Sequence, residues 1–312
     1  MRALACPASL KGVLTAPAAA AALAEGLRAR GAEAVELPVA DGGEGTAEVL
    51  RLALGGTWRE ADVHDAFGLA RRARWLLLPD GTAVVEAAAA VPLDPERLDP
   101  LAASSQGFGE LVAAALAEGP AALLLCLGGT ATMDAGAGLL EVVRELPVPA
   151  RVACDVTATL AEAPRVFGPQ KGAGPAEVAE LERRFAALEE LVSIRHKPGS
   201  GAAGGLGAAL ASLGAELVPG AALVLDAVGF DASGYDLVVT GEGRVDATTA
   251  LGKAPGEVAR RSTGTRCAVF GGLVETVIPG VEMFALSGDP ARVRDDLVAL
   301  GRDLVSDRHK PA

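Results

Sequence analysis

Four glycine-rich segments carry acids, lysines and hydroxyl groups in patterns that suit the binding of anions or metal ions. They are ADGGEGT (40–46), LGGTATMDAGAG (127–138), FGPQKGAG (167–174) and TGEGRVDATTALGKAP (240–255). Glycine lets backbone N–H groups approach a ligand closely, and the start of a helix carries partial positive charge. These segments therefore predict sites for phosphates, carboxylates, or a metal ion with a hydroxylated substrate.

The first three segments are individually ambiguous. Asp41 and Glu44 could hold a metal ion or substrate hydroxyls, but a loop with a helix cap explains ADGGEGT equally well. In the second segment, Thr130 and Asp134 lie between an apolar run and a helical pattern, which is again a strand-loop-helix context. Neither this segment nor FGPQKGAG, which contains Lys171, matches the G-x-x-x-x-G-K-[ST] pattern of a Walker A loop.

The fourth segment directly follows the apolar run DLVVT and contains Glu242, Arg244, Asp246 and Lys253. In an open α/β sheet, ligands bind outside the carboxyl ends of the strands, where this loop must lie. A charged, glycine-rich strand end is more typical of a binding site than of a helix cap.

A further segment, GSGAAGGLG (199–207), contains a literal G-x-G-x-x-G, and Asp226 follows Gly204 by 22 residues. This arrangement resembles a dinucleotide-binding motif, which leaves an NAD-dependent oxidoreductase as a remote alternative. The motif requires a buried strand immediately before it, whereas the preceding RHKP is charged and broken by proline. We favour a glycine turn that leads into a tightly packed alanine-rich helix, with a phosphate contact at Gly201 and Gly204.

The elements that position these loops alternate along the chain. The run RALAC, a helix capped by Thr15 and ended by Gly31, the run AEAVELPV and a helix from near Glu44 predict a parallel sheet with covering helices. The runs ARWLLL and TAVVEAA flank residues 79–81, Pro-Asp-Gly, which predicts a hairpin and a mixed sheet. An apolar stripe from Pro175 to Val192 predicts a core helix. The runs DLVVT, RCAVF and EMFAL predict later strands.

Composition and charge limit the number of domains and the classes of protein to consider. A chain of 312 residues that is 50% hydrophobic predicts two domains with sizeable cores. A net charge of −12 without a basic stripe excludes a general nucleic-acid-binding protein. No apolar run approaches the roughly 18–20 residues of a membrane span, and MRALACPASLKG lacks a signal-peptide core, so we expect a cytoplasmic protein. The cysteines form no CxxC pair and are expected to be reduced and buried: Cys6, Cys126, Cys154 and Cys267.

Taken in order, these segments resemble the glycerate kinase type-1 family. The match runs through PASLKG, ADGGEGT, ASSQGFGEL, GGTATMDAGAG, CDV, FGPQKGA, GSGAAGGLGAAL, DLVVTGEGRVD, GKAP and FALSGDP. Each motif is weak alone, but the ordered set is specific and covers nearly the whole chain. The resemblance implies an enzyme that phosphorylates D-glycerate with ATP and Mg²⁺, giving 2-phosphoglycerate rather than 3-phosphoglycerate.

The resemblance also implies two α/β domains with the active site in the cleft between them. One is a discontinuous flavodoxin-like domain with a parallel sheet, expected at residues 1–60 and 263–312. The other is an α/β domain with a mixed sheet, expected at residues 61–262. A small-molecule substrate is implied, with no nucleic-acid or membrane partner, and a homodimer stays open.

Phosphoryl transfer mainly requires positioning and charge neutralisation, which suggests roles for the candidate residues. The catalytic candidates are two mobile cations for the phosphates and one acid that orients the attacking hydroxyl: Lys11, Lys171 and Asp155. The substrate-binding candidates are Ser9, Asp41, Glu44 and Arg244. The candidates for nucleotide and phosphate binding are Gly128, Gly129, Thr130, Asp134, Gly201, Gly204 and Lys253. The candidates for Mg²⁺, which prefers one or two carboxylates plus phosphate oxygens, are Glu242 and Asp246.

The chain departs from the family pattern in the predicted loops. Ala8 stands where the family usually has Asp, and Thr130, Met133 and Thr248 stand where it usually has Ser, Asn and Gln. A chain-wide loss of amides accounts for the last two differences but not for Ala8. A related sugar-acid kinase, or a catalytically weakened paralogue, is therefore the alternative function.

Overall fold

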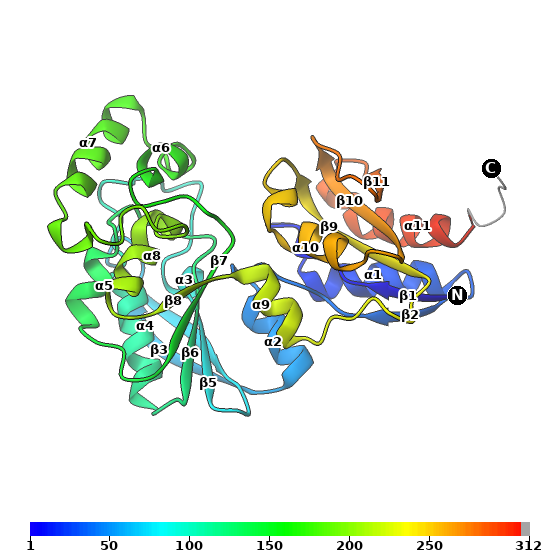
Figure 1. Cartoon of the computed structure of the whole chain (residues 1–312), viewed down its shortest axis with the longest axis horizontal. Helices are drawn as coiled ribbons and strands as arrows, with labels where there is room; N and C mark the ends of the chain where they lie inside the picture. Colours follow the sequence, from blue (N-terminus) through cyan, green and yellow to red (C-terminus); the bar gives the residue numbers. More distant parts are fainter. Residues whose placement is uncertain (307–312) are drawn as a thin grey trace. The chain divides into compact units, whose positions relative to one another are not determined.

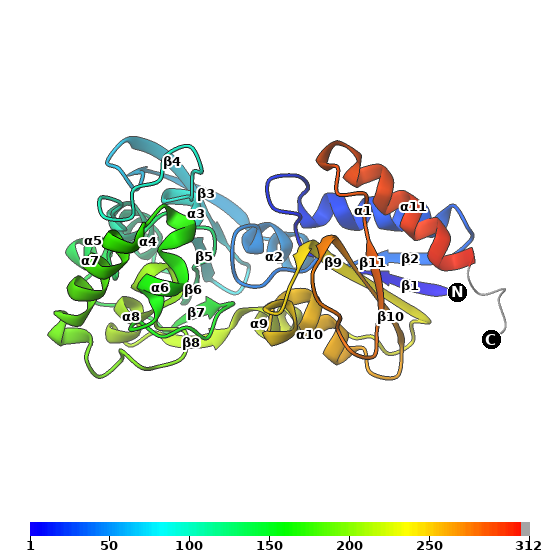
Figure 2. The same ribbon diagram turned by 90° about the horizontal axis from the view of Figure 1, so that it is seen from above.

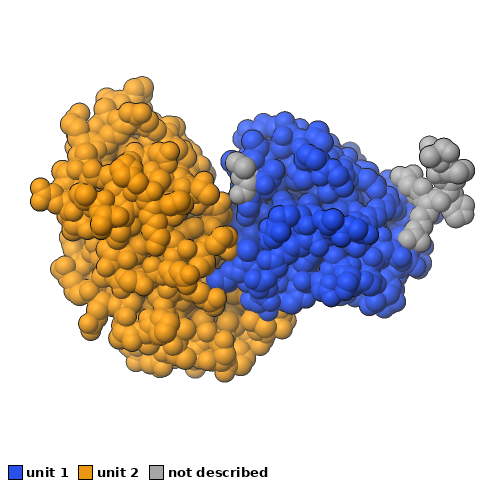
Figure 3. Space-filling view, in the orientation of Figure 1, with its two compact units in different colours: residues 1–41, 221–312 blue, residues 42–220 orange. Residues whose placement is uncertain are grey.

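The structure is a computed structural model that describes residues 1–306, apart from the side chain of Leu251. The chain divides into two compact units, coloured separately in Figure 3. The first contains residues 1–41 and the chain from 221 onward, and the second contains residues 42–220. The end of the expected domain 263–312, residues 307–312, lies outside the described residues.

The first unit contains a five-stranded parallel sheet in the order β2-β1-β9-β10-β11. Counted within the unit, this order is 2-1-3-4-5, which is the flavodoxin-like arrangement. Its elements are β1 (Arg2–Ala5), α1 (Ala16–Arg28), β2 (Glu33–Glu36), α9 (Gly220–Ala227), β9 (Leu237–Val245), η3 (Thr249–Leu251), α10 (Ala254–Arg261), β10 (Arg266–Val274), β11 (Glu282–Ala285), η4 (Pro290–Arg292) and α11 (Val293–Ser306).

Helices cover both faces of this sheet. Successive residues of a strand point to opposite sides, so alternate residues of β1 belong to different apolar cores. Ala3 and Ala5 of β1 join the core under α1 and α11, whereas Leu4 joins the core under α9 and α10. Figures 1 and 2 both show α1 and α11 side by side. Gly26 permits this close approach, since a Cβ built there would lie 2.1 Å from the carbonyl oxygen of Val298.

The second unit contains a six-stranded mixed sheet in the order β3-β4-β5-β6-β7-β8. The first three strands are antiparallel, and β5 to β8 are parallel. Its elements are α2 (Thr46–Leu54), β3 (Thr57–His64), β4 (Ala70–Leu77), β5 (Thr82–Glu86), α3 (Ala87–Ala90), α4 (Gln106–Ala117), β6 (Ala122–Cys126), α5 (Ala137–Val142), β7 (Ala150–Cys154), α6 (Ala163–Phe167), η1 (Pro169–Lys171), α7 (Pro175–Ala186), η2 (Glu189–Leu191), α8 (Ala202–Ser212) and β8 (Glu216–Pro219).

The predicted fold class, with one parallel and one mixed sheet, is confirmed. The hairpin predicted at residues 79–81 joins β4 and β5. Thr15 caps α1, and its hydroxyl oxygen accepts a hydrogen bond from Ala18 N at 3.4 Å. The four cysteines are buried free thiols. Within residues 1–306, no helix is both long and apolar enough to cross a membrane.

The boundaries between the units and the end of one helix differ from expectation. Strand β9 pairs with β1 and β10, so residues 221–262 belong to the first unit rather than to the expected domain 61–262. Residues 42–60 belong to the second unit, where β3 pairs with β4. An apolar run such as DLVVT shows that a strand forms but does not show which sheet it joins.

The helix predicted from Pro175 to Val192 is shorter than expected. Helix α7 ends at Ala186, and Val192, beyond it, is 55% exposed.

Candidate active site

The carboxyl ends of β1, β2 and β9 lie at one edge of the parallel sheet of the first unit. Ser9 and Lys11 follow β1, Asp41 follows β2, and Glu242 lies near the end of β9. The strand order reverses between β1 and β9, and ligands of open α/β sheets bind at such a switch point. The loop after β1 packs on β9, since a Cβ built at Gly243 would lie 3.8 Å from Lys11 N. Lys11 itself is exposed.

Three acids and a lysine gather at this edge. Glu242 accepts a hydrogen bond from the Thr249 hydroxyl at 2.7 Å, and Lys253 Nζ lies 4.0 Å from Glu242 Oε2 and 3.8 Å from Asp246 Oδ1. Burial raises the pKa of Glu242, and the charges of Asp41 and Asp246 raise it further, against the opposing effects of Thr249 and Lys253. These electrostatic effects show that the predicted residues Asp41, Glu242, Asp246 and Lys253 are neighbours.

The chemistry of this cluster fits Mg²⁺. Within residues 1–306, no group of three or more histidines, cysteines and acids is arranged to hold a metal ion. Glu242 and Asp246 offer carboxylate oxygens, and Mg²⁺ in nucleotide sites is held by one or two carboxylates, with phosphates and waters completing its shell. Asp246 is suited to this role because the hydrogen bond from the Thr248 hydroxyl lowers its pKa and favours the charged form.

Arg244 lies apart from this cluster. Its guanidinium forms a two-pronged ion pair with Glu275, with Nε–Oε2 and Nη2–Oε1 distances of 3.0 and 2.8 Å. The two side chains are 63% and 41% exposed, so this is a surface pair. The predicted role of Arg244 in binding a substrate carboxylate would require this pair to open.

In the second unit, Gly128, Gly129 and Thr130 follow β6, and Asp155 follows the neighbouring parallel strand β7. Lys171 reaches the same loop, where its Nζ donates to the carbonyl oxygen of Thr132 at 2.8 Å and to Thr130 Oγ1 at 3.5 Å. Lys171 is only 4% exposed. Burial lowers its pKa to about 7, although Asp134 opposes this shift. Lys171 is therefore held in place and is not the mobile cation predicted from its glycine neighbours.

Asp134 supports the loop that carries Thr130. Its Oδ2 accepts hydrogen bonds from the backbone N–H and the hydroxyl of Ser105, both at 2.7 Å. The N–H groups of Gly136 and Gly138 also donate to this carboxylate, each at 3.1 Å. With four protein donors, the carboxylate occupies the start of α5, where the sequence suggested that a phosphate could bind. This arrangement favours a structural role for Asp134.

Glu86 is a residue that the sequence analysis missed. It ends β5, and its Oε1 accepts a hydrogen bond from Ala47 N, at the start of α2, at 2.7 Å. Burial raises the pKa of Glu86, while the N–H groups of Ala47 and Gly45 lower it. The helix start in ADGGEGT, where an anion was predicted, therefore already holds a carboxylate of the protein. An acid inside the apolar run TAVVEAA was the available signal.

Glu44, in the same segment, is exposed but lies beside the β6 loop. A Cβ built at Gly129 would lie 3.5 Å from Glu44 Oε2. Gly128 is placed more tightly, since a Cβ there would lie only 2.7 Å from the Cα of Gly43. The structure thus brings together the predicted residues Glu44, Gly128, Gly129 and Thr130.

Gly201 and Gly204 serve close packing of the chain on itself. A Cβ at Gly204, where φ is +70°, would lie 2.0 Å from the carbonyl oxygen of Thr132. A Cβ at Gly201 would lie 2.3 Å from the carbonyl oxygen of Thr159. The segment that precedes them, residues 189–200, contains η2 and turns instead of a strand. The literal G-x-G-x-x-G therefore lacks the context of a dinucleotide site.

The fold and these loops define a class of two-unit α/β proteins, with lysines and carboxylates at the carboxyl ends of parallel strands. The model of the glycerate kinase family matches residues 3–144 and 143–283. The chain belongs to this family.

Relatives of known name agree with this assignment. The chain is 37% identical over 305 residues to glycerate 2-kinase of Escherichia coli, covering 82% of this chain and 80% of the relative. It is 36% identical over 323 residues to glycerate kinase of Bacillus subtilis, covering 87% and 84%. The crystal structure of a protein assigned as glycerate kinase 2 from Salmonella typhimurium LT2 is similar, with a TM-score of 0.80, 30% identity, and coverage of 99% of this chain and 98% of that one.

Proposed function

We propose that this protein transfers the γ-phosphoryl group of ATP to D-glycerate and yields 2-phosphoglycerate. One observation carries the proposal beyond family membership: Glu242, Asp246 and Lys253 meet at the strand end beside the loop of Lys11. Carboxylates that hold a metal ion and cations that face phosphates are the parts that phosphoryl transfer requires. The relative from Escherichia coli that is named glycerate 2-kinase supports the choice of product.

The first unit contributes charge neutralisation in this proposal. Glu242 and Asp246 would hold Mg²⁺, which neutralises charge on the phosphates when bound. Lys253 lies within 4.0 Å of both carboxylates and holds them near each other. Lys11 is an exposed cation that would contact a phosphate. The partly exposed Ser9 and Asp41 would bind the glycerate hydroxyls, by donating and accepting hydrogen bonds respectively.

The second unit contributes the fixed lysine and the acid that orients the acceptor. Lys171 holds the Thr130 loop in shape through its hydrogen bonds, and its charged form attracts phosphate oxygens. Asp155 is partly exposed at the end of β7. It would accept the proton of the glycerate hydroxyl while that oxygen bonds to the γ-phosphorus and the bond to the ADP oxygen breaks.

The test is an ADP-release assay with a panel of small hydroxy acids, run with and without Mg²⁺. Turnover with D-glycerate that requires Mg²⁺ supports the proposal, and phosphorus NMR of the product identifies the phosphorylated hydroxyl. Turnover with another acid but not with glycerate would select the alternative, a related sugar-acid kinase. No turnover with any acid would contradict both and leave the catalytically weakened paralogue.

Ala8 is the observation that favours the alternative. It lies in the loop after β1, where its N–H donates to the carbonyl oxygen of Gly241 at 2.9 Å, and it packs in the apolar cluster with Leu4, Cys6 and Val39. The side chain is 8% exposed, so the position usually occupied by an Asp is here part of the core. A different acid substrate would account for this change.

A further inference from the structure

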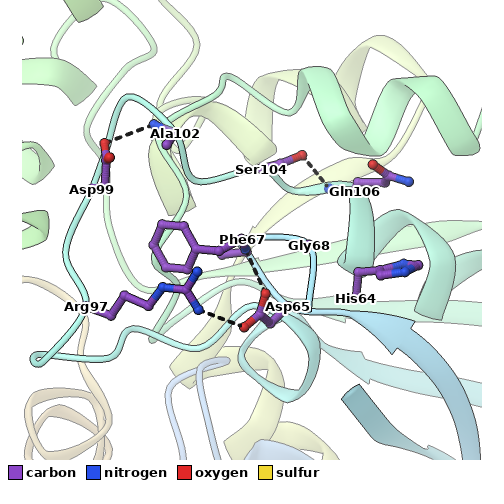
Figure 4. A pocket seen from close by; sticks show the side chains of 10 residues that line it. His64, Asp65, Phe67, Gly68, Arg97, Asp99, Ala102, Ser104 and Gln106 are labelled. Atoms are coloured by element: carbon purple, nitrogen blue, oxygen red, sulfur yellow. Dashed lines mark hydrogen bonds and ion pairs between the residues drawn. The ribbon is translucent and has the colours of Figure 1, made fainter. Parts of the chain in front are cut away.

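The second unit contains a cavity of about 490 Å³ that none of the candidate residues lines. Its walls are the turn between β3 and β4, the segment 97–102 and the start of α4, and Figure 4 shows it from close by. The volume lies within the roughly 300–1,000 Å³ typical of small-molecule sites.

An aromatic ring with a fixed orientation forms one wall. The guanidinium of Arg97 lies 4.1 Å from the centre of the Phe67 ring, and its Nη1 lies 3.6 Å from Asp65 Oδ2. Asp65 Oδ1 in turn accepts hydrogen bonds from Phe67 N at 2.8 Å and from Leu69 N at 2.9 Å. These contacts hold both the ring and the turn that carries it. The guanidinium covers one face of the ring, and the ring also packs against the apolar core of the unit. The remaining surface of this half-buried ring lines the cavity and is what a planar ligand could contact.

Polar groups with unused capacity lie nearby. Asp99 accepts from the N–H groups of Leu101 and Ala102, both through Oδ1, and Ser104 Oγ accepts from Gln106 N. Among the hydrogen bonds of residues 1–306, none uses Asp99 Oδ2 or the hydroxyl proton of Ser104. A ligand could therefore donate to the first group and accept from the second.

The charge around the cavity disfavours a free anion. Asp65 and Asp99 outnumber Arg97, and Glu110, whose carboxylate lies 3.0 Å from His64 Nδ1, adds further negative charge. A planar, uncharged ligand with hydroxyl groups matches these walls better. A nucleobase that stacks on Phe67, with ribose hydroxyls that donate to Asp99, has this chemistry.

The cavity adjoins the loops assigned to phosphate binding in the same unit. Leu98, between Arg97 and Asp99, packs on the residue after Lys171, since a Cβ at Gly172 would lie 2.7 Å from Leu98 Cβ. Ser105, next to Ser104, donates to Asp134 in the Thr130 loop. We propose that this cavity binds the adenosine part of ATP. The inference rests on the proposed function, because it takes ATP to be the phosphoryl donor.

The test compares matched variants of one hairpin. Phe67→Leu keeps apolar volume but removes the aromatic ring from the cavity wall. Trp58→Leu is the control: the Trp58 ring also contacts an arginine, with Arg74 4.0 Å from its centre, but neither residue lines the cavity. Calorimetry with adenosine and with ADP should show binding weakened about tenfold by Phe67→Leu and unchanged by Trp58→Leu. The KM for ATP should rise similarly, with the KM for glycerate unchanged.

Asp99→Asn provides a second readout should Phe67→Leu fail to fold, as judged by thermal unfolding. It should weaken adenosine binding more than binding of inorganic triphosphate. Adenosine and ADP affinities within twofold of wild type in the folded variants would overturn the inference while leaving glycerate phosphorylation intact. A wild-type protein that binds adenosine through Phe67 but does not phosphorylate glycerate would support the inference and contradict the proposed function.

Discussion

Lys171 Nζ lies 2.8 Å from the carbonyl oxygen of Thr132, and burial holds the pKa of this lysine near 7. A lysine in this position cannot move to meet a ligand. The ligand must come to it, and the loop that it fixes must already have the correct shape. Fixed donors of this kind stabilise developing charge without the cost of reorganisation during the reaction.

Lys171→Met should lower kcat/KM for glycerate phosphorylation by about 10²–10³-fold, because one charge-stabilising group is lost. The protein should remain folded, since Met fills similar apolar space at this buried position. Steady-state kinetics and circular dichroism measure the two effects, with Lys197→Met, at an exposed lysine, as the control. Unchanged kinetics would remove Lys171 from the site.

The buried lysine also predicts a pH dependence of stability. Between about pH 7 and its usual pKa of 10.5, the folded protein leaves Lys171 neutral while the unfolded chain binds a proton. The free energy of unfolding therefore gains a contribution as pH rises, by roughly 1.4 kcal/mol per pH unit, and this contribution is lost as pH falls to 7. Urea unfolding of wild type and Lys171→Met at pH 7.5 and 9.0 should show the free energy of unfolding of wild type rising relative to that of the variant as pH increases. A difference independent of pH would show that Lys171 is charged in the folded protein.

Asp246→Asn should raise the Mg²⁺ concentration required for half-maximal activity more than it raises the KM for glycerate. The amide oxygen is a poorer ligand than a carboxylate for a hard cation, and the remaining ligand, Glu242, has a raised pKa. Activity measured against Mg²⁺ concentration tests this, with Asp303→Asn on the exposed face of α11 as the control. Normal Mg²⁺ dependence would assign Asp246 to holding Thr248 and the loop.

Ala8→Asp should destabilise the protein by roughly 2 kcal/mol or more, because it places a carboxylate in the apolar cluster at the end of β1. Activity with glycerate should fall or stay level. Thermal unfolding and glycerate kinetics measure these effects, and Ala21→Asp on the exposed face of α1 provides a control. A tenfold gain in glycerate activity would instead mean that the missing acid alone limits this enzyme.

Replacement by Asn should mainly affect stability at Asp134 and catalytic rate at Asp155. Asp134→Asn should cost about 1–3 kcal/mol of stability, because an amide cannot accept all four hydrogen bonds, yet should leave kcat near wild type once folded. Asp155→Asn should lower kcat, because an amide cannot accept the proton of the glycerate hydroxyl. Denaturant titration and kinetics of both variants separate the roles, and a loss of ATP affinity in folded Asp134→Asn would restore the predicted role in nucleotide binding.

Much of the fold followed from local sequence patterns. The Thr15 cap, the hairpin at residues 79–81 and the strand runs each depend on short-range chemistry that a sequence displays directly. The placement of β9 depends on a partner more than two hundred residues away, and no local pattern encodes it. The division into units was therefore not readable from sheet type alone.

The candidate residues show the same limit. Glycine neighbours suggested that Lys171 is mobile, but burial depends on distant segments that meet around it. Helix starts suggested anion sites, but Glu86 and Asp134 already fill them. Glu86 contacts Ala47, which is 39 residues away in the sequence, and Asp134 contacts Ser105, which is 29 residues away. The gathering of Glu242, Asp246 and Lys253 was predictable, because all three lie close together in the sequence between the end of β9 and the start of α10.

The insertion of β9 between β1 and β10 has a consequence for the order in which the newly made chain can fold. Residues 42–220 are contiguous and contain all six strands of their sheet, so this unit can fold as soon as it leaves the ribosome. Strands β1 and β2 leave earlier, but their neighbour β9 is synthesised only after that whole unit. The edge of β1 that pairs with β9 therefore stays unpaired until β9 has been synthesised. A nascent chain arrested before residue 237 should be prone to aggregate through that edge.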